Sequence, residues 1–163
     1  MIEIRAYRPG DADALGLVFH RSVREGARHA YSAAQVAAWS PAPPSGPDWQ
    51  ARLNSAFALV AVIDAAPVGF MTMNSGGFAK KGGYIDLAFV LPEQMGTGVA
   101  NSLYAVLENH ARAEGLERLT TQASLLAEPF FARHGWYVTE RQTVTRTKVD
   151  LPNAWMEKTL ASA

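Results

Sequence analysis

Two glycines one residue apart, Gly96 and Gly98, stand between a short apolar run and an amphipathic segment. Glycine lets the backbone pass close to a bulky group, and Ala100 is small enough to leave the first turn of a following helix open. The free amides of that turn and the positive end of the helix dipole then point at whatever the loop holds. A pyrophosphate group fits these requirements, because amide hydrogen bonds can bind it without side-chain cations.

The letters of this loop argue against the common nucleotide motifs. A Walker loop requires Gly-Lys-Ser/Thr, and GTGVAN contains no lysine. A dinucleotide fingerprint requires a third glycine where Asn101 stands, and it follows the first strand of its unit, whereas this loop follows the fourth predicted strand. An ordinary glycine-rich turn before a helix is the remaining alternative. The loop residues alone do not distinguish such a turn from a pyrophosphate-binding loop, so the surrounding sequence has to be considered.

One charged side chain, Asp86, interrupts the apolar run YIDLAFV at positions 84–90. A carboxylate in an otherwise apolar central strand is a candidate general base, which would accept a proton directly or through water. The alternative is a structural carboxylate held by backbone amides or by an arginine. The sequence leaves both open.

Composition narrows the class of protein. The 163 residues fit one domain, 1–163, and 15 basic against 15 acidic residues lack the cationic excess of a nucleic-acid surface. The absence of cysteine excludes a thiolate metal site, a Cys nucleophile and disulfides, and the four histidines show no ligand spacing. The N-terminus is unlike a secretory signal, and no apolar run approaches about 18 residues. We therefore predict a cytoplasmic protein with no metal, no nucleic-acid partner and no membrane partner.

The elements that must position these residues follow from periodicity and from helix and turn signals. The proline-rich segment 40–48 is expected to be a helix-free connection, and Pro67 is expected in a hairpin turn. Ser32 and Gln35 resemble a capping box that starts a helix reaching Trp39. The predicted order is β-α-α-β-β-β-α-β-α-β-β, a mixed α/β sheet covered by helices. Strands are predicted at 2–8, 57–63, 68–74, 84–90, 118–123, 136–142 and 154–160, and helices at 10–26, 32–39, 98–113 and 128–134.

Taken together, the strand YIDLAFVLPE, the loop MGTGVA and the later EPFFARHGWYV resemble the Gcn5-related N-acetyltransferase (GNAT) family. Its signature loop, Gln/Arg-x-x-Gly-x-Gly/Ala, is matched from Met95 to Ala100. Its second signature is a helix with an aromatic pair before x-x-x-Gly-aromatic. The element order is also that of the family, so the resemblance covers nearly the whole chain. YSAAQVAAW and LPNAWMEKTL look like an uncharacterised bacterial subgroup.

This resemblance implies the acyl-CoA N-acyltransferase fold, with acetyl-CoA as the cosubstrate. The coenzyme pyrophosphate would lie on the loop and the pantetheine arm along the fourth strand, where amides near Phe89 and Val90 would hold the carbonyl oxygen. Phe130 and Phe131 are expected to line the pantetheine or to belong to the core. The implied loop residues are Met95, Gly96, Thr97, Gly98, Val99 and Ala100.

Two positions depart from the family pattern. Met95 replaces the signature Gln or Arg, which removes one side-chain contact to phosphate but leaves the amides. Phe131 stands where the family often has a tyrosine near the coenzyme sulfur as general acid, so the usual proton donor is missing. The remaining candidates for an acid or an alternative base are Tyr31, Tyr84, Tyr137 and His134.

By the same resemblance, Tyr31, Gln35 and Trp39 border the acceptor pocket. Tyr31 is the catalytic candidate at the joint of the helix pair, although an aromatic that merely covers the core fits equally well. His134 follows a helix, where a histidine stabilised by the helix dipole is common.

The sequence therefore predicts an acyltransferase that moves an acetyl group from acetyl-CoA to a primary amine of a small molecule by direct attack. Two alternatives stay open. One is an N-acetyltransferase acting on a peptide or protein N-terminus, and the other is a non-catalytic CoA-binding regulatory module, suggested by Phe131. The acceptor and the oligomeric state are not specified, and a homodimer is one alternative.

Overall fold

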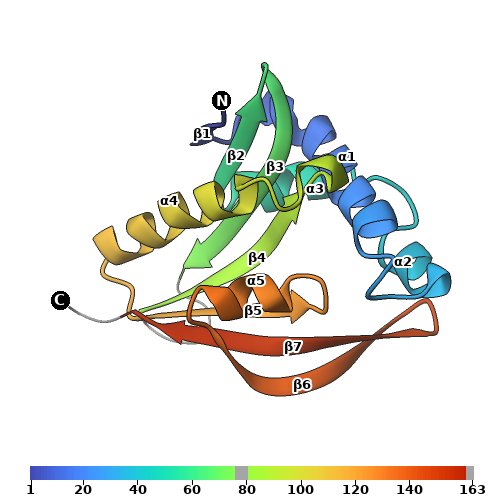
Figure 1. Ribbon diagram of the computed structural model, residues 1–163. Helices are drawn as coiled ribbons and strands as arrows, with labels where there is room; N and C mark the ends of the chain where they lie inside the picture. Colours follow the sequence, from blue (N-terminus) through green and yellow to red (C-terminus); the bar gives the residue numbers. More distant parts are fainter. Residues whose placement is uncertain (76–80, 161–163) are drawn as a thin grey trace.

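The computed structural model describes residues 1–75 and 81–160, and its strands form one mixed sheet (Figure 1). The strand order across the sheet is β1-β2-β3-β4-β5-β7-β6. Neighbouring strands are antiparallel except for the central pair β4 and β5, which is parallel. The strands are β1 (Glu3–Ala6), β2 (Phe57–Ile63), β3 (Ala66–Ser75), β4 (Gly82–Val90), β5 (Arg118–Ser124), β6 (Tyr137–Arg146) and β7 (Val149–Thr159).

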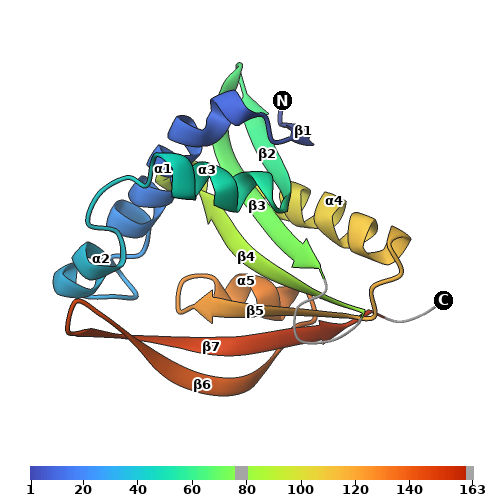
Figure 2. The same ribbon diagram turned by 180° about the vertical axis from the view of Figure 1, so that it is seen from behind.

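Helices cover both faces of this sheet. The apolar stripe of α4 packs on one face, where Leu103 and Leu107 are fully buried, and α5 lies on the same side (Figure 1). Helices α1 and α3 cover the other face, with Leu15 and Leu53 in a second core cluster (Figure 2). The helices are α1 (Ala12–Arg21), extended by a π-helical turn at Ser22–Gly26, α2 (Ala33–Trp39), α3 (Pro47–Asn54), α4 (Val99–Ala113) and α5 (Glu128–Arg133). None of these helices is both long and apolar enough to cross a membrane.

The expected fold class is confirmed, with one additional helix. Helix α3 begins inside the segment that was expected to be free of helix, so the expectation for 40–48 was wrong at its end. Pro47 occupies the first helical turn, where its missing amide costs no hydrogen bond, and Asp48 beside it favours the helix N-terminus. Trp49 and Leu53, one turn apart, then bury the inner side of the helix.

The β2–β3 hairpin also differs from expectation at its turn. The turn residues are Asp64 and Ala65, with φ of 50° and 64°, as a two-residue hairpin requires. Pro67 lies within β3 opposite Val62 rather than in the turn, so that expectation was wrong. The strand tolerates this proline because the register shifts beside it, where Val68 is the extra residue.

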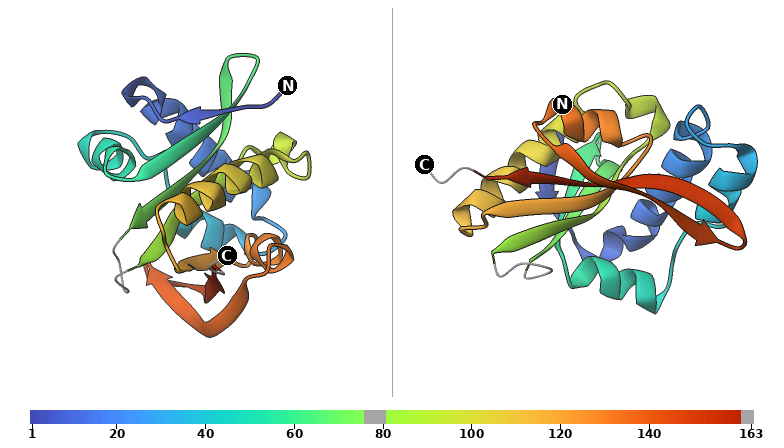
Figure 3. Two further views of the ribbon diagram at one scale, coloured as in Figure 1. Left: turned by 90° about the vertical axis from the view of Figure 1, so that its left-hand side faces the viewer. Right: turned by 90° about the horizontal axis from the view of Figure 1, so that it is seen from below.

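The hairpin β6–β7 is longer than its sequence pattern suggested. Its strands pair from Tyr137 opposite Glu157 as far as Arg146 opposite Val149. The hairpin runs under the rest of the sheet, and its tip reaches α2 (Figure 3). There Gln35 donates its side-chain amide to the carbonyl of Asp150 at 2.9 Å. The C-terminal hairpin therefore closes one side of the space beneath β4.

Candidate active site

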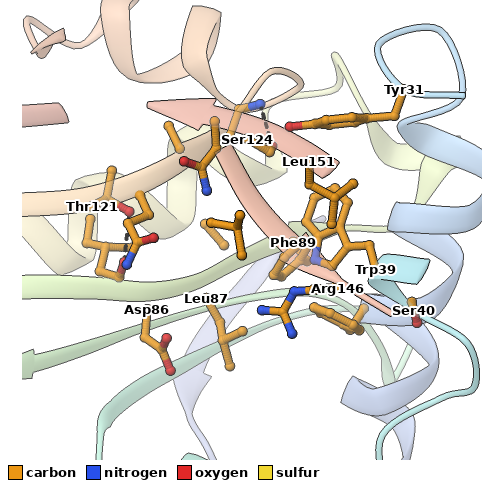
Figure 4. Close-up of a pocket in the computed structure, with 18 of the residues that line it drawn as sticks. Tyr31, Trp39, Ser40, Asp86, Leu87, Phe89, Thr121, Ser124, Arg146 and Leu151 are labelled. Carbon is orange, nitrogen blue, oxygen red and sulfur yellow. Dashed lines mark hydrogen bonds between the residues drawn. The ribbon is translucent and has the colours of Figure 1, made fainter. Parts of the chain in front are cut away.

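A cavity of about 500 Å³ opens where the two central parallel strands separate. β4 and β5 pair only from Gly82 opposite Arg118 to Ile85 opposite Thr121, although β4 continues to Val90 and β5 to Ser124. The divergence is visible in Figure 1, and Figure 4 shows side chains from both strands pointing into the space between them. Other walls come from α1, α2, the segment after α2, and the β6–β7 hairpin.

The edge of β4 that faces this opening carries free main-chain donors. The amides of Leu87 and Leu91 donate toward β3, to the Thr72 hydroxyl at 3.1 Å and the Val68 carbonyl at 2.8 Å. Because strand amides alternate in direction, those of Ala88 and Val90 point to the other edge, which β5 has left. Of the two residues expected to hold a carbonyl oxygen, Val90 thus turns its amide to the opening, and Phe89 contributes its ring to the cavity wall.

Asp86 lies at a bulge in β4 and lines the cavity. Thr72 pairs with Leu87 and Met73 with Ile85, so Asp86 is the extra residue, an arrangement that re-aims a side chain. Its two oxygens accept hydrogen bonds from Nε and Nη2 of Arg52 on α3, at 2.7 and 2.8 Å. These bonds to Asp86 raise the pKa of Arg52. Each carboxylate oxygen keeps a free lone pair, so the pair does not by itself prevent proton transfer.

The glycine loop before α4 forms an open cradle of backbone. Gly96 and Gly98 have φ of 78° and 95°, and a Cβ atom at either position would meet no heavy atom within 4 Å. The first amides of the 15-residue helix α4 have no intrahelical acceptor. The residues present therefore fit an anionic group such as a pyrophosphate. Thr97 stabilises the turn through a hydrogen bond from its hydroxyl to the Gln94 carbonyl at 2.6 Å.

Met95 is turned toward the N-terminal helices, where its terminal methyl group packs against Gly26. An exposed bidentate ion pair between Arg21 and Glu93 spans the same junction at 2.9 Å. The side chain that replaces the signature Gln or Arg thus packs against the end of the first helix.

The aromatic pair on α5 divides between core and surface. Phe131 is 1% exposed, contacts Trp136 with ring centroids 4.8 Å apart, and contributes to the cavity wall. Phe130 is half-buried between Tyr104 and His134 and lies outside the cavity lining. No hydroxyl stands at position 131, as the sequence already states.

The Tyr31 hydroxyl bridges two segments of the cavity wall. It donates to the Pro152 carbonyl in β7 at 2.6 Å and accepts from the Leu125 amide after β5 at 2.9 Å. Burial raises the pKa of Tyr31, which makes the phenol a weaker acid. A role as proton donor would require this hydroxyl to leave Pro152.

We expect Tyr31→Phe to lower the free energy of unfolding by about 1–3 kcal/mol, because the Leu125 amide and the Pro152 carbonyl would lose their partner. Urea denaturation measures this. Tyr137→Phe is the matched control, since its exposed hydroxyl donates to Glu157 at 3.0 Å, and a change within about 0.5 kcal/mol is expected. A Tyr31 variant of unchanged stability but lower kcat would instead assign the hydroxyl to the chemistry.

The other predicted residues divide between the cavity and the surface. Trp39 lines the cavity, whereas Gln35 lies outside its lining and completes the capping box with Ser32. Tyr84 lines the cavity and accepts a hydrogen bond from Gln122 at 3.3 Å, and its burial raises its pKa. Tyr137 is exposed, and His134 contacts Asn101 on α4.

Among the cavity residues that the sequence did not predict, three polar side chains matter most for the chemistry. Arg52 was not predicted as a site residue because α3 was not predicted. Arg146 was not predicted because the strands of the β6–β7 hairpin were expected to be shorter. Ser40 lines the cavity with its hydroxyl 2.7 Å from Nδ1 of His20. Burial, followed by the charge of Arg24, lowers the pKa of His20, so its ring is neutral near pH 7. The alternation of QTVTRTKVDL could have revealed the longer hairpin.

Comparison with known proteins establishes the family of this chain. Residues 27–159 match the family model of the acetyltransferase (GNAT) domain. The chain belongs to the GNAT family. The expectation of an acetyl-CoA-dependent N-acetyltransferase is thereby confirmed. Among residues 1–75 and 81–160, no group of three or more His, Asp or Glu side chains is placed to hold a metal ion.

Relatives of this GNAT chain extend over nearly its whole length. It is 36% identical over 154 residues to YafP of Escherichia coli strain K12, described as an uncharacterized N-acetyltransferase, which covers 94% of this chain and 90% of YafP. A GCN5-related N-acetyltransferase structure from Rhodopseudomonas palustris superposes with a TM-score of 0.87 at 32% identity, covering 97% and 95% of the two chains. YncA from Salmonella typhimurium, whose structure contains its cofactor acetyl-CoA, shares the fold with a TM-score of 0.76 at 15% identity, covering 100% and 96%.

Proposed function

We propose that this GNAT enzyme transfers the acetyl group of acetyl-CoA to a primary amine of a small molecule, by direct attack of the amine on the thioester. One observation carries the proposal. The opening between β4 and β5 has free main-chain donors along one edge, a carboxylate at a bulge, and a helix N-terminus with open amides beyond the end of β4. Thioester polarisation, amine deprotonation and pyrophosphate binding need these three features.

For the coenzyme, we propose that the amides of the loop from Met95 to Ala100 bind the pyrophosphate. The positive φ of Gly96 and Gly98 and the open space over both residues support this assignment. The free amide of Val90 would hold the thioester carbonyl oxygen in the opening, beside the ring of Phe89. Phe131 would then contribute apolar lining, and Phe130 would pack beside it on α5. The coenzyme supplies an activated acetyl group at this position.

For the acceptor, we propose that Asp86 takes the proton of the attacking amine, directly or through one water molecule. Its position on the cavity wall and the free lone pair on each oxygen support this role. The nitrogen–carbon bond forms as the carbon–sulfur bond breaks, and the amine proton passes to the carboxylate. Arg52 fixes the direction of that carboxylate.

The chain has no tyrosine at position 131, and the chemistry does not demand one. A cysteine thiol ionises near pH 8.5, below the values of about 10 for a tyrosine phenol and about 10.4 for a lysine amine, so the sulfur can leave as a thiolate and take its proton from solvent. Tyr31 would then act as a wall of the acceptor pocket beside Trp39, with its hydroxyl held by Leu125 and Pro152. Gln35 would support that wall by tying α2 to β7.

The closed side of the cavity favours a small acceptor over a peptide. Hydrogen bonds from Tyr31 to Pro152 and from Gln35 to Asp150 join α2 to the C-terminal hairpin, where an extended chain would otherwise pass. A protein N-terminus would need this junction to open. A cytoplasmic location and a homodimer stay predictions.

Steady-state release of free thiol from acetyl-CoA tests the proposed function. We expect sustained release with small primary amines and much slower release with peptides that have a free N-terminus. Parallel calorimetry establishes whether acetyl-CoA binds. Preference for peptides would favour the first alternative function. Coenzyme binding without amine-dependent release would indicate the regulatory module instead.

A further inference from the structure

A second arginine reaches the cavity from the C-terminal hairpin. Arg146 is the last residue of β6 and pairs with Val149 across a two-residue turn, Thr147 and Lys148, with φ of 46° and 62°. Figure 4 shows its guanidinium group pointing into the cavity. The hairpin is anchored to α2 by Gln35 and Tyr31, so the cation is carried on a supported element.

The charges along the cavity wall do not balance. Its only charged residues within the described chain are Arg52, Asp86 and Arg146. Arg52 and Asp86 neutralise each other through two hydrogen bonds. The side chain of Arg146 forms no hydrogen bond or ion pair with any residue in 1–75 or 81–160. One uncompensated guanidinium group with five N–H donors thus faces the space proposed for the acceptor. The planar arrangement of these donors suits a carboxylate, which accepts two parallel hydrogen bonds from an arginine.

The remaining surface beside this cation is apolar and aromatic. Phe19 contacts Phe89 with ring centroids 4.6 Å apart, and Trp39 packs edge-on against Phe89 at 6.1 Å. All three rings line the cavity. They offer a wall for a hydrocarbon or aromatic group, while Asp86 offers a partner for an ammonium group.

We propose that the acceptor is a primary amine that also carries a carboxylate next to an apolar body, as in an amino acid with an apolar or aromatic side chain. Arg146 binds the carboxylate, the aromatic wall holds the apolar body, and the amino group lies toward Asp86. This inference rests on the proposed function and names the substrate class of the same site. The reaction is unchanged: the amino nitrogen gains the acetyl carbon, loses one proton, and the thiolate departs.

A role of Arg146 in coenzyme binding is the competing assignment. The loop from Met95 to Ala100 lies outside the cavity lining to which Arg146 belongs. We therefore expect Arg146→Gln to leave the Kd for acetyl-CoA within about twofold of the wild-type value.

Matched pairs of acceptors test the proposal: L-phenylalanine with 2-phenylethylamine, L-tryptophan with tryptamine, and L-leucine with isopentylamine. In each pair the carboxylate is the principal difference. We expect the wild-type enzyme to favour the acid by roughly tenfold to a hundredfold in kcat/KM, the value of a hydrogen-bonded charge pair. Arg146→Gln is expected to remove this preference through KM, whereas Arg146→Lys retains part of it. Lys148→Gln, which removes a cation from the same turn but not from the cavity, should change nothing.

Calorimetric binding of L-phenylalanine to the enzyme with CoA bound gives a second readout that needs no turnover. Binding that weakens in Arg146→Gln but not in Lys148→Gln supports the proposal. Equal use of both members of every pair, equal effects of the two variants, or weakened acetyl-CoA binding in Arg146→Gln would each overturn it. If the amines without a carboxylate support thiol release and none of the amino acids does, the proposed function stands and this substrate class is wrong. If acetyl-CoA binds and no amine of any kind reacts, both fail.

Discussion

Gly98→Arg is expected to abolish measurable binding of acetyl-CoA while the protein remains folded. Gly98 caps α4 with φ of 95°, and the space over its α-carbon is open, so an added side chain would fill the region proposed for the pyrophosphate. The positive charge of the introduced arginine would not compensate for the lost contacts, since the bulk of the side chain would keep the phosphates away from the helix amides. We expect a loss in affinity of roughly a hundredfold or more, about 3 kcal/mol, in calorimetric titration.

Two controls separate blocked binding from backbone strain. Gly98→Ala carries a similar penalty for a positive φ, about 1–3 kcal/mol of stability, with almost no added bulk, and it should retain most of the affinity. Gly115→Arg places the same side chain at the other end of α4, again at positive φ (75°) and in open space. It should cost similar stability and leave coenzyme binding intact. Unchanged affinity in Gly98→Arg would remove the loop from the account.

Asp86→Asn is expected to lower kcat by roughly 10²- to 10⁴-fold, the usual contribution of a general base, with little change in the Kd for acetyl-CoA. The amide keeps the size of the side chain but cannot accept the proton. Stopped-time product assays at saturating substrate measure this.

Arg52→Gln is the matched control for this variant, because both substitutions break the same ion pair. The pair is partly exposed, so each change should cost at most about 1 kcal/mol of stability. Arg52→Gln keeps the carboxylate, so its kcat should fall far less than that of Asp86→Asn. Equal losses of kcat in the two variants would show that Asp86 serves only to pair with Arg52.

The loop proposed to bind the coenzyme is the part of the candidate site whose conformation could be predicted best from the sequence. Gly96 and Gly98 adopt positive φ, and α4 begins at Val99, because glycine spacing and helix periodicity are both local properties of the chain. The capping box at Ser32 and Gln35 is local in the same sense and was also predicted. The family and the fold class were also predicted from local sequence patterns of this kind.

The part of the cavity proposed for the acceptor could not be predicted as well, because contacts between residues far apart in the sequence create it. Arg52 meets Asp86 across 34 positions of sequence, and Tyr31 meets Pro152 across 121. Such partners depend on how α3 and the β6–β7 hairpin pack, and no periodicity within either segment encodes that. The start of α3 could nevertheless be predicted from Gly46-Pro47-Asp48, because a proline in the first turn of a helix does not break it.

A crystal structure with acetyl-CoA bound tests the central claim most directly. We expect the pyrophosphate oxygens within hydrogen-bonding distance of the amides of Gly98, Val99 and Ala100, and the thioester oxygen beside the amide of Val90. A coenzyme whose phosphates lie away from the α4 N-terminus, or whose acetyl group lies outside the opening between β4 and β5, would contradict the account.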